Sequence, residues 1–376
     1  MKILLAPNSF KESLNPVTIT SILAEYLNND KEILLYQKPL SDGGDGFLNV
    51  INFINDVNDI TFQNLSNYSD YFSKYFYLRN IKSCTIYLES ANLFGLKVIK
   101  KEDRSPLNLS SELLGKILLK FSEMKLNGEI NIENVVIGVG GTATIDAGFG
   151  ACSQVGLNFY DKENKLLEAI PNNFGRVTKL EFNKVPLQFK MKFIVDVDTE
   201  LIGDPGAIEI YGKQKEASEH DLKKIKDGIT NILHLIQRDL GIDIPERLNG
   251  AGGGLACGFN LLYGSEIVSA RKFIEDEILK DINLDDIDLV ISGEGSFDQQ
   301  SFEGKGSGVI LDLFKDRKAK IVLINGITEI PENFKLPHNL TIINISKFFK
   351  SKEESINNSE IGIRKAVEII KSQFGL

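Results

Sequence analysis

Residues 134–148 read Asn-Val-Val-Ile-Gly-Val-Gly-Gly-Thr-Ala-Thr-Ile-Asp-Ala-Gly. The apolar run at 135–139 predicts a short buried strand, the glycine pair at 140–141 predicts a turn, and residues 151–155 can be helical. Glycines without a Cβ atom let the backbone approach a ligand, and the free N–H groups of a helix start suit an anion such as phosphate. The stretch is therefore either a phosphate-binding turn or an ordinary turn between a strand and a helix.

The N-terminal end of the chain shows the same order of strand, loop and helix. Residues 3–6 form a short apolar strand, and a polar loop with Ser9 and Lys11 follows it. Apolar spacing then predicts a helix from about residue 17 to residue 27. Lys11 is either a solvated surface lysine or a phosphate ligand.

Four polar loops follow predicted strands, at residues 8–13, 41–46, 140–146 and 293–305. Each loop is a weak signal alone. Because ligands of open α/β sheets bind at the carboxyl ends of the strands, loops in these places are expected to converge. The second loop carries Asp42 and Asp45 among glycines, which is typical of a tight turn and equally of a hydroxyl or magnesium contact.

Asp196 and Asp198 follow a predicted strand at residues 189–195. Two acids two positions apart on a strand point the same way, which makes a good site for a cation or a hydroxyl group. The histidines lie away from the four loops, which disfavours a nucleophilic triad. Phosphoryl transfer instead needs positioning, cations and backbone donors, and the residues of these loops suit it.

The overall pattern predicts two domains in a chain of 376 residues. Alternating helices and strands at both ends, with a mixed middle, predict an α/β fold with a doubly wound parallel sheet and a second domain inserted in it. The expected domains are 1–60 with 280–376, and an insertion at 61–279. Residues 134–156 belong to the insertion or, alternatively, to the terminal domain.

The composition excludes several classes of partner. The net charge of −9 and the isoelectric point of about 5.2 argue against nucleic acid or an anionic membrane. Three widely spaced cysteines form no disulfide framework or zinc motif, which fits a reducing cytosol. No signal-peptide core or spanning apolar run is present, so a cytoplasmic location is expected.

Several motifs span nearly the whole chain. They are Ala6–Leu14, Ser41–Gly46, Gly138–Gly148, Asp196–Asp198, Gly212–Lys215, Gly250–Gly254, Ser292–Asp298 and Gly304-Lys305. In content and in order along the chain, these motifs resemble those of the glycerate kinase type-1 family of bacteria. The resemblance implies ATP-dependent phosphorylation of D-glycerate with Mg2+. It also implies a flavodoxin-like domain with an inserted α/β domain and an active site in the cleft, and it leaves a homodimer open.

The resemblance also suggests roles for individual residues. Lys11, with Ser9 nearby, is expected to neutralise the transferred phosphate, and the backbone of Gly140, Gly141 and Thr142 to cradle the nucleotide phosphates. Asp196 or Asp298 is expected to accept the hydroxyl proton of glycerate, and Asp196 and Asp42 are the candidate magnesium ligands. Lys305 or Arg104 is expected to bind the substrate carboxylate. The remaining candidates for substrate or phosphate binding are Gly43, Gly44, Gly293 and Glu294.

The chain departs from the family pattern at two polar positions. Asn8 stands where aspartate is usual, and Ile145 where asparagine is common. Either change can alter affinity or substrate preference, so a kinase for another small hydroxy acid is an alternative. A non-catalytic regulator that binds nucleotides or sugar acids is a second one. The resemblance to the family favours the 2-hydroxyl of glycerate over the 3-hydroxyl as the group that is phosphorylated.

Overall fold

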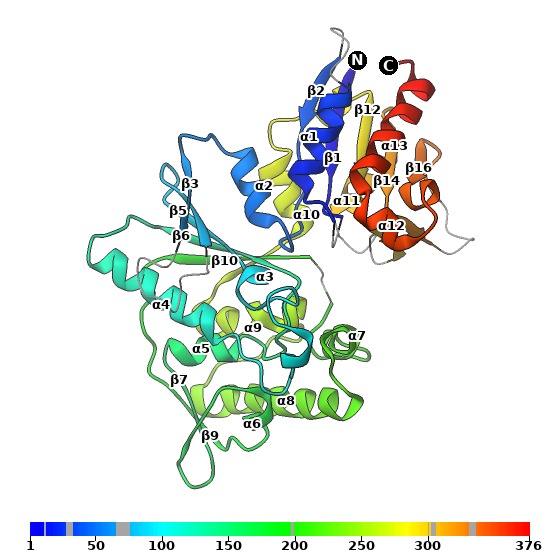
Figure 1. Ribbon diagram of the computed structural model, residues 1–376. Helices are drawn as coiled ribbons and strands as arrows, with labels where there is room; N and C mark the ends of the chain where they lie inside the picture. Colours follow the sequence, from blue (N-terminus) through cyan, green and yellow to red (C-terminus); the bar gives the residue numbers. More distant parts are fainter. Residues whose placement is uncertain are drawn as a thin grey trace. The chain divides into compact units, whose positions relative to one another are not determined.

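The computed structural model describes residues 1–10, 13–27, 33–64, 76–196, 199–299, 301, 306–330 and 336–376, apart from the side chains of residues 62 and 64. The chain divides into two compact units. The smaller unit contains residues 1–57 and 269–376, and the larger unit contains residues 58–268. Each unit has its own central sheet, shown in Figure 1.

The sheet of the smaller unit has five parallel strands in the order β16-β14-β12-β1-β2. The strands are β1 (Lys2–Pro7), β2 (Leu34–Gln37), β12 (Leu289–Gly293), β14 (Lys320–Asn325) and β16 (Leu340–Asn344). Numbered within this unit, they follow the order 2-1-3-4-5 of flavodoxin-like folds. The predicted doubly wound parallel α/β sheet is therefore confirmed.

Both faces of this sheet are buried, as a doubly wound sheet requires. Alternate residues such as Ile3 and Ile291 pack with α1 (Pro16–Leu27) and α13 (Ser359–Phe374) in one apolar cluster. Leu4 and Val290, which point the other way, are fully buried as well. The helix α11 (Gly306–Phe314) also contacts the sheet, at strands β1, β12 and β14.

The smaller unit contains further helices and two short strands outside the main sheet. They are α2 (Phe47–Ile54), α10 (Ala270–Phe273), a π-helix (Ile274–Ile278), 3-10 helices at Leu284–Asp286 and Ile345–Phe348, α12 (Lys352–Asn357), and the strands β13 (Ser296–Asp298) and β15 (Ile327–Glu329). The parallel pair of β13 and β15 follows β12 and β14 directly in sequence. These two short strands therefore lie just beyond the carboxyl ends of the sheet.

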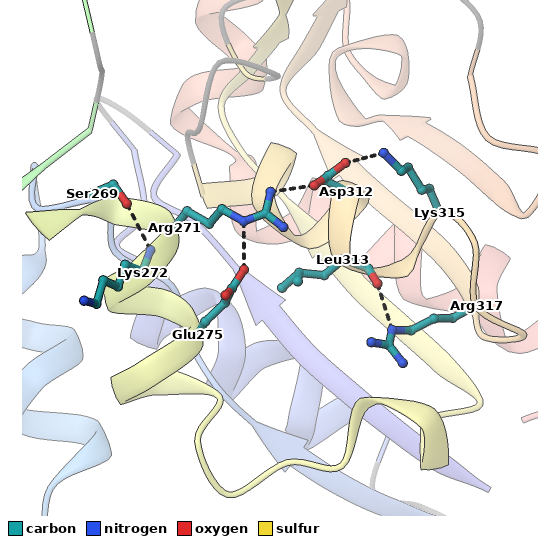
Figure 2. A network of polar contacts seen from close by, with 8 residues as sticks. All are labelled: Ser269, Arg271, Lys272, Glu275, Asp312, Leu313, Lys315 and Arg317. Carbon is teal, nitrogen blue, oxygen red and sulfur yellow. Dashed lines mark hydrogen bonds and ion pairs between the residues drawn. The ribbon is translucent and has the colours of Figure 1, made fainter.

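Side chains from α10, the π-helix, α11 and the residue after α11 form a network of ion pairs, drawn in Figure 2. Arg271 donates to Glu275 at 2.8 Å and to Asp312 at 2.5 Å, and Lys315 also contacts Asp312. All of these side chains keep more than a third of their surface exposed. Because exposed ion pairs contribute roughly 0–1 kcal/mol each, apolar packing rather than this network holds α11 in place.

The larger unit is built on a mixed sheet in the order β11-β10-β6-β5-β4-β3. The strands are β3 (Ile60–Asn64), β4 (Phe76–Asn80), β5 (Thr85–Glu89), β6 (Asn134–Val139), β10 (Lys190–Val195) and β11 (Glu266–Ser269). The strand predicted at 135–139 is β6, which pairs in parallel with β5 and β10. This pairing places the glycine-rich stretch at 134–148 in the larger unit rather than in the sheet formed by the chain ends.

Helices and a small antiparallel sheet complete the core of the larger unit. The helices are α3 (Ser90–Phe94), α4 (Glu112–Leu126), α5 (Phe149–Gln154), α6 (Pro171–Phe174), α7 (Ala207–Gly212), α8 (Glu219–Leu240) and α9 (Ala251–Tyr263), with 3-10 turns at Lys101–Asp103 and Lys213–Lys215. The sheet β8-β7-β9 contains Leu166–Leu167, Leu157–Tyr160 and Lys179–Phe182. Apolar side chains of α4, α5, α8 and α9 share one buried cluster with those of the central sheet.

Three successive glycines near the start of α9 have backbone angles that are not helical. Gly252, Gly253 and Gly254 all have left-handed backbone angles, with φ of 61°, 76° and 79°. A Cβ atom on Gly253 would lie 2.1 Å from the Thr144 carbonyl oxygen. The glycines are therefore needed because this turn packs directly against the backbone of the first glycine-rich loop.

Candidate functional site

In the smaller unit, the candidate residues gather where the strand order reverses between β1 and β12. Pro7 lies opposite Gly293 in the parallel register, so Asn8 and Glu294 leave neighbouring strands at the same level. The Asn8 N–H donates to the Gly293 carbonyl at 2.9 Å, and the Gly295 N–H donates to the Ser9 carbonyl at 3.4 Å. Such a reversal point is where doubly wound sheets bind ligands. The structure thus brings Ser9, Gly293 and Glu294 together at this edge of the sheet.

Asp42 joins this group through a hydrogen bond with Asn8. The Asn8 Nδ2 atom donates to Asp42 Oδ2 at 3.1 Å, and Asn8 Oδ1 accepts from the Ser9 N–H at 2.8 Å. The other oxygen of Asp42 accepts from the Gly44 N–H at 3.2 Å, and Gly43 has a φ of 94° in the same turn. Asn8 is only 4% exposed, so its amide is fixed in one orientation.

We expect Asn8→Asp to lower the free energy of unfolding by about 1–3 kcal/mol at pH 7, because a buried hydrogen bond is replaced by two adjacent carboxylates. The loss should shrink as the pH falls, since the pair then gains a proton. Urea unfolding at pH 7 and pH 5 measures both effects.

The double variant Asn8→Asp with Asp42→Asn is the matched control for this prediction. It reverses the polarity of the pair and again allows one amide-to-carboxylate hydrogen bond, so most of the lost stability should return. A single variant as stable as the native protein at pH 7 would show that the contact between Asn8 and Asp42 contributes nothing to folding.

Glu294 connects the end of β12 to the first turn of α11. Its carboxylate accepts a hydrogen bond from the Ser307 hydroxyl, and its N–H donates to Asn325 Oδ1 at 3.3 Å. A Cβ atom on Gly306 would lie 2.6 Å from Asn8 Nδ2, so the helix begins against the Asn8 side chain. Glu294, Asn8 and the start of α11 therefore form one packed cluster.

Asp298 lies at the end of β13 and takes part in a reciprocal turn contact. Its Oδ1 atom accepts from the Ser301 N–H at 3.3 Å, and its own N–H donates to the Ser301 hydroxyl at 3.1 Å. These bonds fix the orientation of the carboxylate. Two predicted cations, Lys11 and Lys305, lie outside the described residues.

In the larger unit, the parallel strands β5, β6 and β10 bring their carboxyl ends to one edge of the sheet. Val139 lies opposite Val195 in register, so Gly140 and Asp196 leave neighbouring strands at the same level. Ser90, which follows β5, has its hydroxyl oxygen 3.4 Å from the Gly140 nitrogen. The predicted phosphate loop and Asp196 are thus neighbours, whereas Asp198 lies outside the described residues.

The loop after β6 is held by contacts with distant segments. The Gly141 carbonyl accepts from the Leu96 N–H at 2.9 Å, and the Thr142 hydroxyl donates to the Gly252 carbonyl at 2.8 Å. Arg104 donates to the Leu96 and Ile99 carbonyls at 2.5 and 3.2 Å. Arg104 therefore supports the segment that holds Gly141, whatever role it has toward a substrate.

Asp146 organises the helix that follows this loop. Its carboxylate is fully buried and accepts from the Ser111 N–H and hydroxyl at 2.7 Å each, and from the N–H groups of Gly148 and Gly150 at 3.1 and 3.2 Å. Burial raises the pKa of Asp146, and the hydrogen bonds oppose that rise. These contacts indicate a structural role at the starts of α4 and α5.

Lys215 is a further polar residue of this loop cluster, and the sequence patterns assigned it no role. Its Nζ atom donates to the Thr142 hydroxyl at 3.2 Å and to the Thr144 carbonyl at 2.9 Å, and the residue is 4% exposed. Burial lowers the pKa of Lys215 from 10.5 to about 8, while Asp146 and Asp196 oppose the fall. The motif Gly212–Lys215 was the only sequence signal, and it did not show that the lysine is buried.

The low pKa of Lys215 predicts a stability change with pH. Between pH 8 and pH 10.5 the unfolded chain keeps a proton that the folded chain loses, so this group raises the free energy of unfolding as the pH increases. Relative to Lys215→Met, the native protein should gain on the order of 2 kcal/mol across this window. Urea unfolding of both proteins at pH 7.5 and pH 10.5 tests the gain.

Comparison of the two proteins removes other titrating groups from this measurement. Burial raises the pKa of Cys257 to about 12 and raises the pKa of Tyr263. The contribution of these two groups to the free energy of unfolding therefore falls with rising pH, and it falls equally in both proteins. An equal pH dependence in the two proteins would show that Lys215 titrates as an ordinary exposed lysine.

The donor chemistry of these loops fits a magnesium ion. Among the described residues, no group of three or more His, Cys, Asp or Glu side chains is arranged to hold a metal. Mg2+ is usually held by one or two carboxylates together with substrate phosphates, and it does not require such a cage. Asp42 and Asp196, each at a strand-end loop, supply carboxylates of this kind.

The doubly wound parallel sheet, with glycine, hydroxyl and carboxylate groups at its strand ends, defines the class of flavodoxin-like α/β proteins, which bind ligands at that edge. The model of the glycerate kinase family matches residues 3–374. The chain belongs to the glycerate kinase family, and its enzyme class is that of a kinase. No helix among the described residues has the length and apolar character needed to span a membrane.

Similar proteins carry the same family name. A glycerate kinase of Neisseria meningitidis serogroup B is 30% identical over 81% of this chain and 80% of its own length. A glycerate kinase of Haemophilus influenzae is 27% identical, covering 87% and 86%, and a glycerate 2-kinase of Escherichia coli K12 is 25% identical, covering 87% and 85%. A crystal structure of a candidate glycerate kinase 2 from Salmonella typhimurium LT2 covers both chains fully, with a TM-score of 0.69 and 22% identity, and shares the fold.

Proposed function

We propose that the protein transfers the γ-phosphoryl group of ATP to a hydroxyl of D-glycerate, giving ADP and phosphoglycerate, with 2-phosphoglycerate as the favoured product. The observation that carries this proposal is the family match over residues 3–374 together with the strand-end loops at Asn8, Glu294, Gly140 and Asp196. Free N–H groups and small residues at such loops suit phosphate groups. The relative from Escherichia coli, named a glycerate 2-kinase, supports the 2-hydroxyl.

The roles proposed for the residues follow from their chemistry. The backbone of Gly140, Gly141 and Thr142 binds nucleotide phosphates, and Lys11 neutralises the transferred group. Asp196 or Asp298 accepts the proton of the attacking hydroxyl. Asp196 and Asp42 are each proposed as a magnesium ligand, and a Mg2+ ion bound together with the phosphates would neutralise charge on the phosphate oxygens.

Further proposed roles concern the acceptor. Lys305 or Arg104 binds the glycerate carboxylate. The residues proposed to line the substrate and phosphate sites are Ser9, Gly43, Gly44, Gly293 and Glu294. Cys84, Cys152 and Cys257 are free thiols, which supports the proposal that the enzyme works in the reducing cytoplasm.

The test is ADP release from the purified protein with Mg-ATP and D-glycerate, followed by phosphorus NMR of the product. We expect glycerate-dependent turnover, no turnover after chelation of magnesium, and a 2-phosphoglycerate signal. A 3-phosphoglycerate signal would support the kinase activity but show that the 3-hydroxyl, not the 2-hydroxyl, is phosphorylated. Turnover only with another small hydroxy acid would favour the alternative acceptor, and the buried Asn8 is then the first residue to exchange.

A further inference from the structure

Lys215 is a buried cation to which the proposed roles assign no task. It ends the 3-10 turn after α7, and its neighbour Lys213 is exposed whereas Lys215 is 4% exposed. Its two acceptors, the Thr142 hydroxyl and the Thr144 carbonyl, both belong to the loop after β6. The lysine therefore reaches from a separate segment into the glycine-rich loop.

The bonds of Lys215 leave its charge incompletely balanced. Both acceptors are neutral oxygen atoms, and within the described part of the chain Lys215 forms no ion pair. Asp146 and Asp196 act on it only from a distance, and Asp146 already accepts four hydrogen bonds of its own. A buried ammonium group without an adjacent anion is costly, which is why burial lowers its pKa.

Two neighbouring hydroxyl groups point to the same conclusion. The Thr142 hydroxyl donates its proton to the Gly252 carbonyl, and its oxygen accepts the hydrogen bond from Lys215. The Thr144 hydroxyl is buried and has no hydrogen-bond partner among the described residues. Buried hydroxyl groups almost always have a partner, so this one is available to a group outside the described residues, such as a water molecule or a ligand.

We propose that Lys215 is a positioning residue for phosphate binding: it holds the loop Gly140–Thr144 in shape and gives that loop the positive charge that attracts a nucleotide phosphate. The Gly140–Thr142 backbone contacts the phosphate, and Lys215 acts through Thr142 and through its charge. The inference rests on the proposed function, because it specifies what makes that loop bind an anion.

The experiment compares binding of Mg-ADP and of adenosine by calorimetry to the native protein, Lys215→Met and Lys215→Arg. Loss of one charged interaction should weaken ADP binding by about 10- to 100-fold in Lys215→Met, while adenosine, which has no phosphate, binds as before. Arginine keeps the charge and should restore most of the ADP affinity. A purely structural role would weaken both ligands equally or neither.

Lys226 provides the matched control. It is a partly buried lysine of the same unit that donates to the Gly203 carbonyl at 3.0 Å and to Glu209 at 2.6 Å, so Lys226→Met should leave ADP binding unchanged. If Lys215→Met does not fold, Thr142→Val tests the same contact with the lysine in place, and ADP binding should again weaken selectively.

The binding measurement separates this inference from the proposed function. Native protein that binds ADP but shows no turnover with D-glycerate would overturn the proposed D-glycerate kinase activity and leave the role of Lys215 in phosphate binding standing. Unchanged ADP affinity in Lys215→Met, or a loss that adenosine shares, would overturn the role of Lys215 while the kinase activity stands.

Discussion

Asp196→Asn is expected to lower kcat by about two to four orders of magnitude, because the attacking hydroxyl then lacks its proton acceptor or the site lacks a cation ligand. Asp196 follows β10 directly and lies level with Gly140 in the register of the sheet. Asparagine keeps the size and one oxygen atom, so the fold should tolerate it. Steady-state kinetics with Mg-ATP and D-glycerate measure the loss.

Asp298→Asn is the paired measurement. Its Oδ1 atom accepts from the Ser301 N–H, a contact that the asparagine oxygen can keep. The variant with the larger loss of kcat contains the better candidate for the base, and a kcat within a few-fold of native for Asp196→Asn would remove Asp196 from that role. Lys11→Ala should also cost orders of magnitude, as the loss of a charge that stabilises the transition state does.

Gly253→Ala is expected to destabilise the larger unit by about 2–5 kcal/mol, since left-handed backbone costs alanine roughly 1–2 kcal/mol and overpacking adds about 1–3 kcal/mol. Gly253 has a φ of 76°, and an added Cβ atom would lie 2.1 Å from the Thr144 carbonyl oxygen. That oxygen is also the acceptor of Lys215, so any shift that relieves the clash disturbs the loop after β6. Urea unfolding and ADP binding report the two effects.

The variant Gly241→Ala measures the cost of left-handed backbone geometry without the cost of a steric clash. Gly241 has a φ of 65°, and no atom lies within 4 Å of the position that an added Cβ atom would take. This variant should therefore lose only about 1–2 kcal/mol and keep native ADP binding. Equal losses in the two variants would mean that contact with Thr144 has no energetic weight.

Local sequence patterns predicted the elements whose causes are local. The helix at 219–240 begins at the Ser218 cap, where the hydroxyl accepts from the Asp221 N–H at 3.2 Å, and ends at Gly241. Both this cap and the apolar spacing of the helix are local patterns. The strand at 135–139 was likewise set by its apolar run and the glycines after it. Both signals lie within a few residues of the element itself.

Features that depend on distant residues were not predictable in the same way. The left-handed turn at Gly252–Gly254 exists because it packs on Thr144, more than a hundred residues earlier in the chain. The bond between Asn8 and Asp42 and the burial of Lys215 also depend on tertiary packing. The resemblance marked these stretches as motifs, but only the folded structure shows which atoms meet.

The sheet order of the smaller unit has a consequence for synthesis of the chain. β1 is hydrogen-bonded to β12, and Leu5 and Ile291, which are paired in register, are separated in the sequence by the whole larger unit. During translation β1 and β2 leave the ribosome first, and the strands that pair with β1 on its other side leave it last. Residues 58–268 are contiguous, so the larger unit can fold in the interval. A folded insert shortens the effective loop that joins β1 to β12, which lowers the entropy cost of closing it. Variants that slow folding of the larger unit should therefore expose the N-terminal strands to aggregation, even when the sequence of the smaller unit is intact.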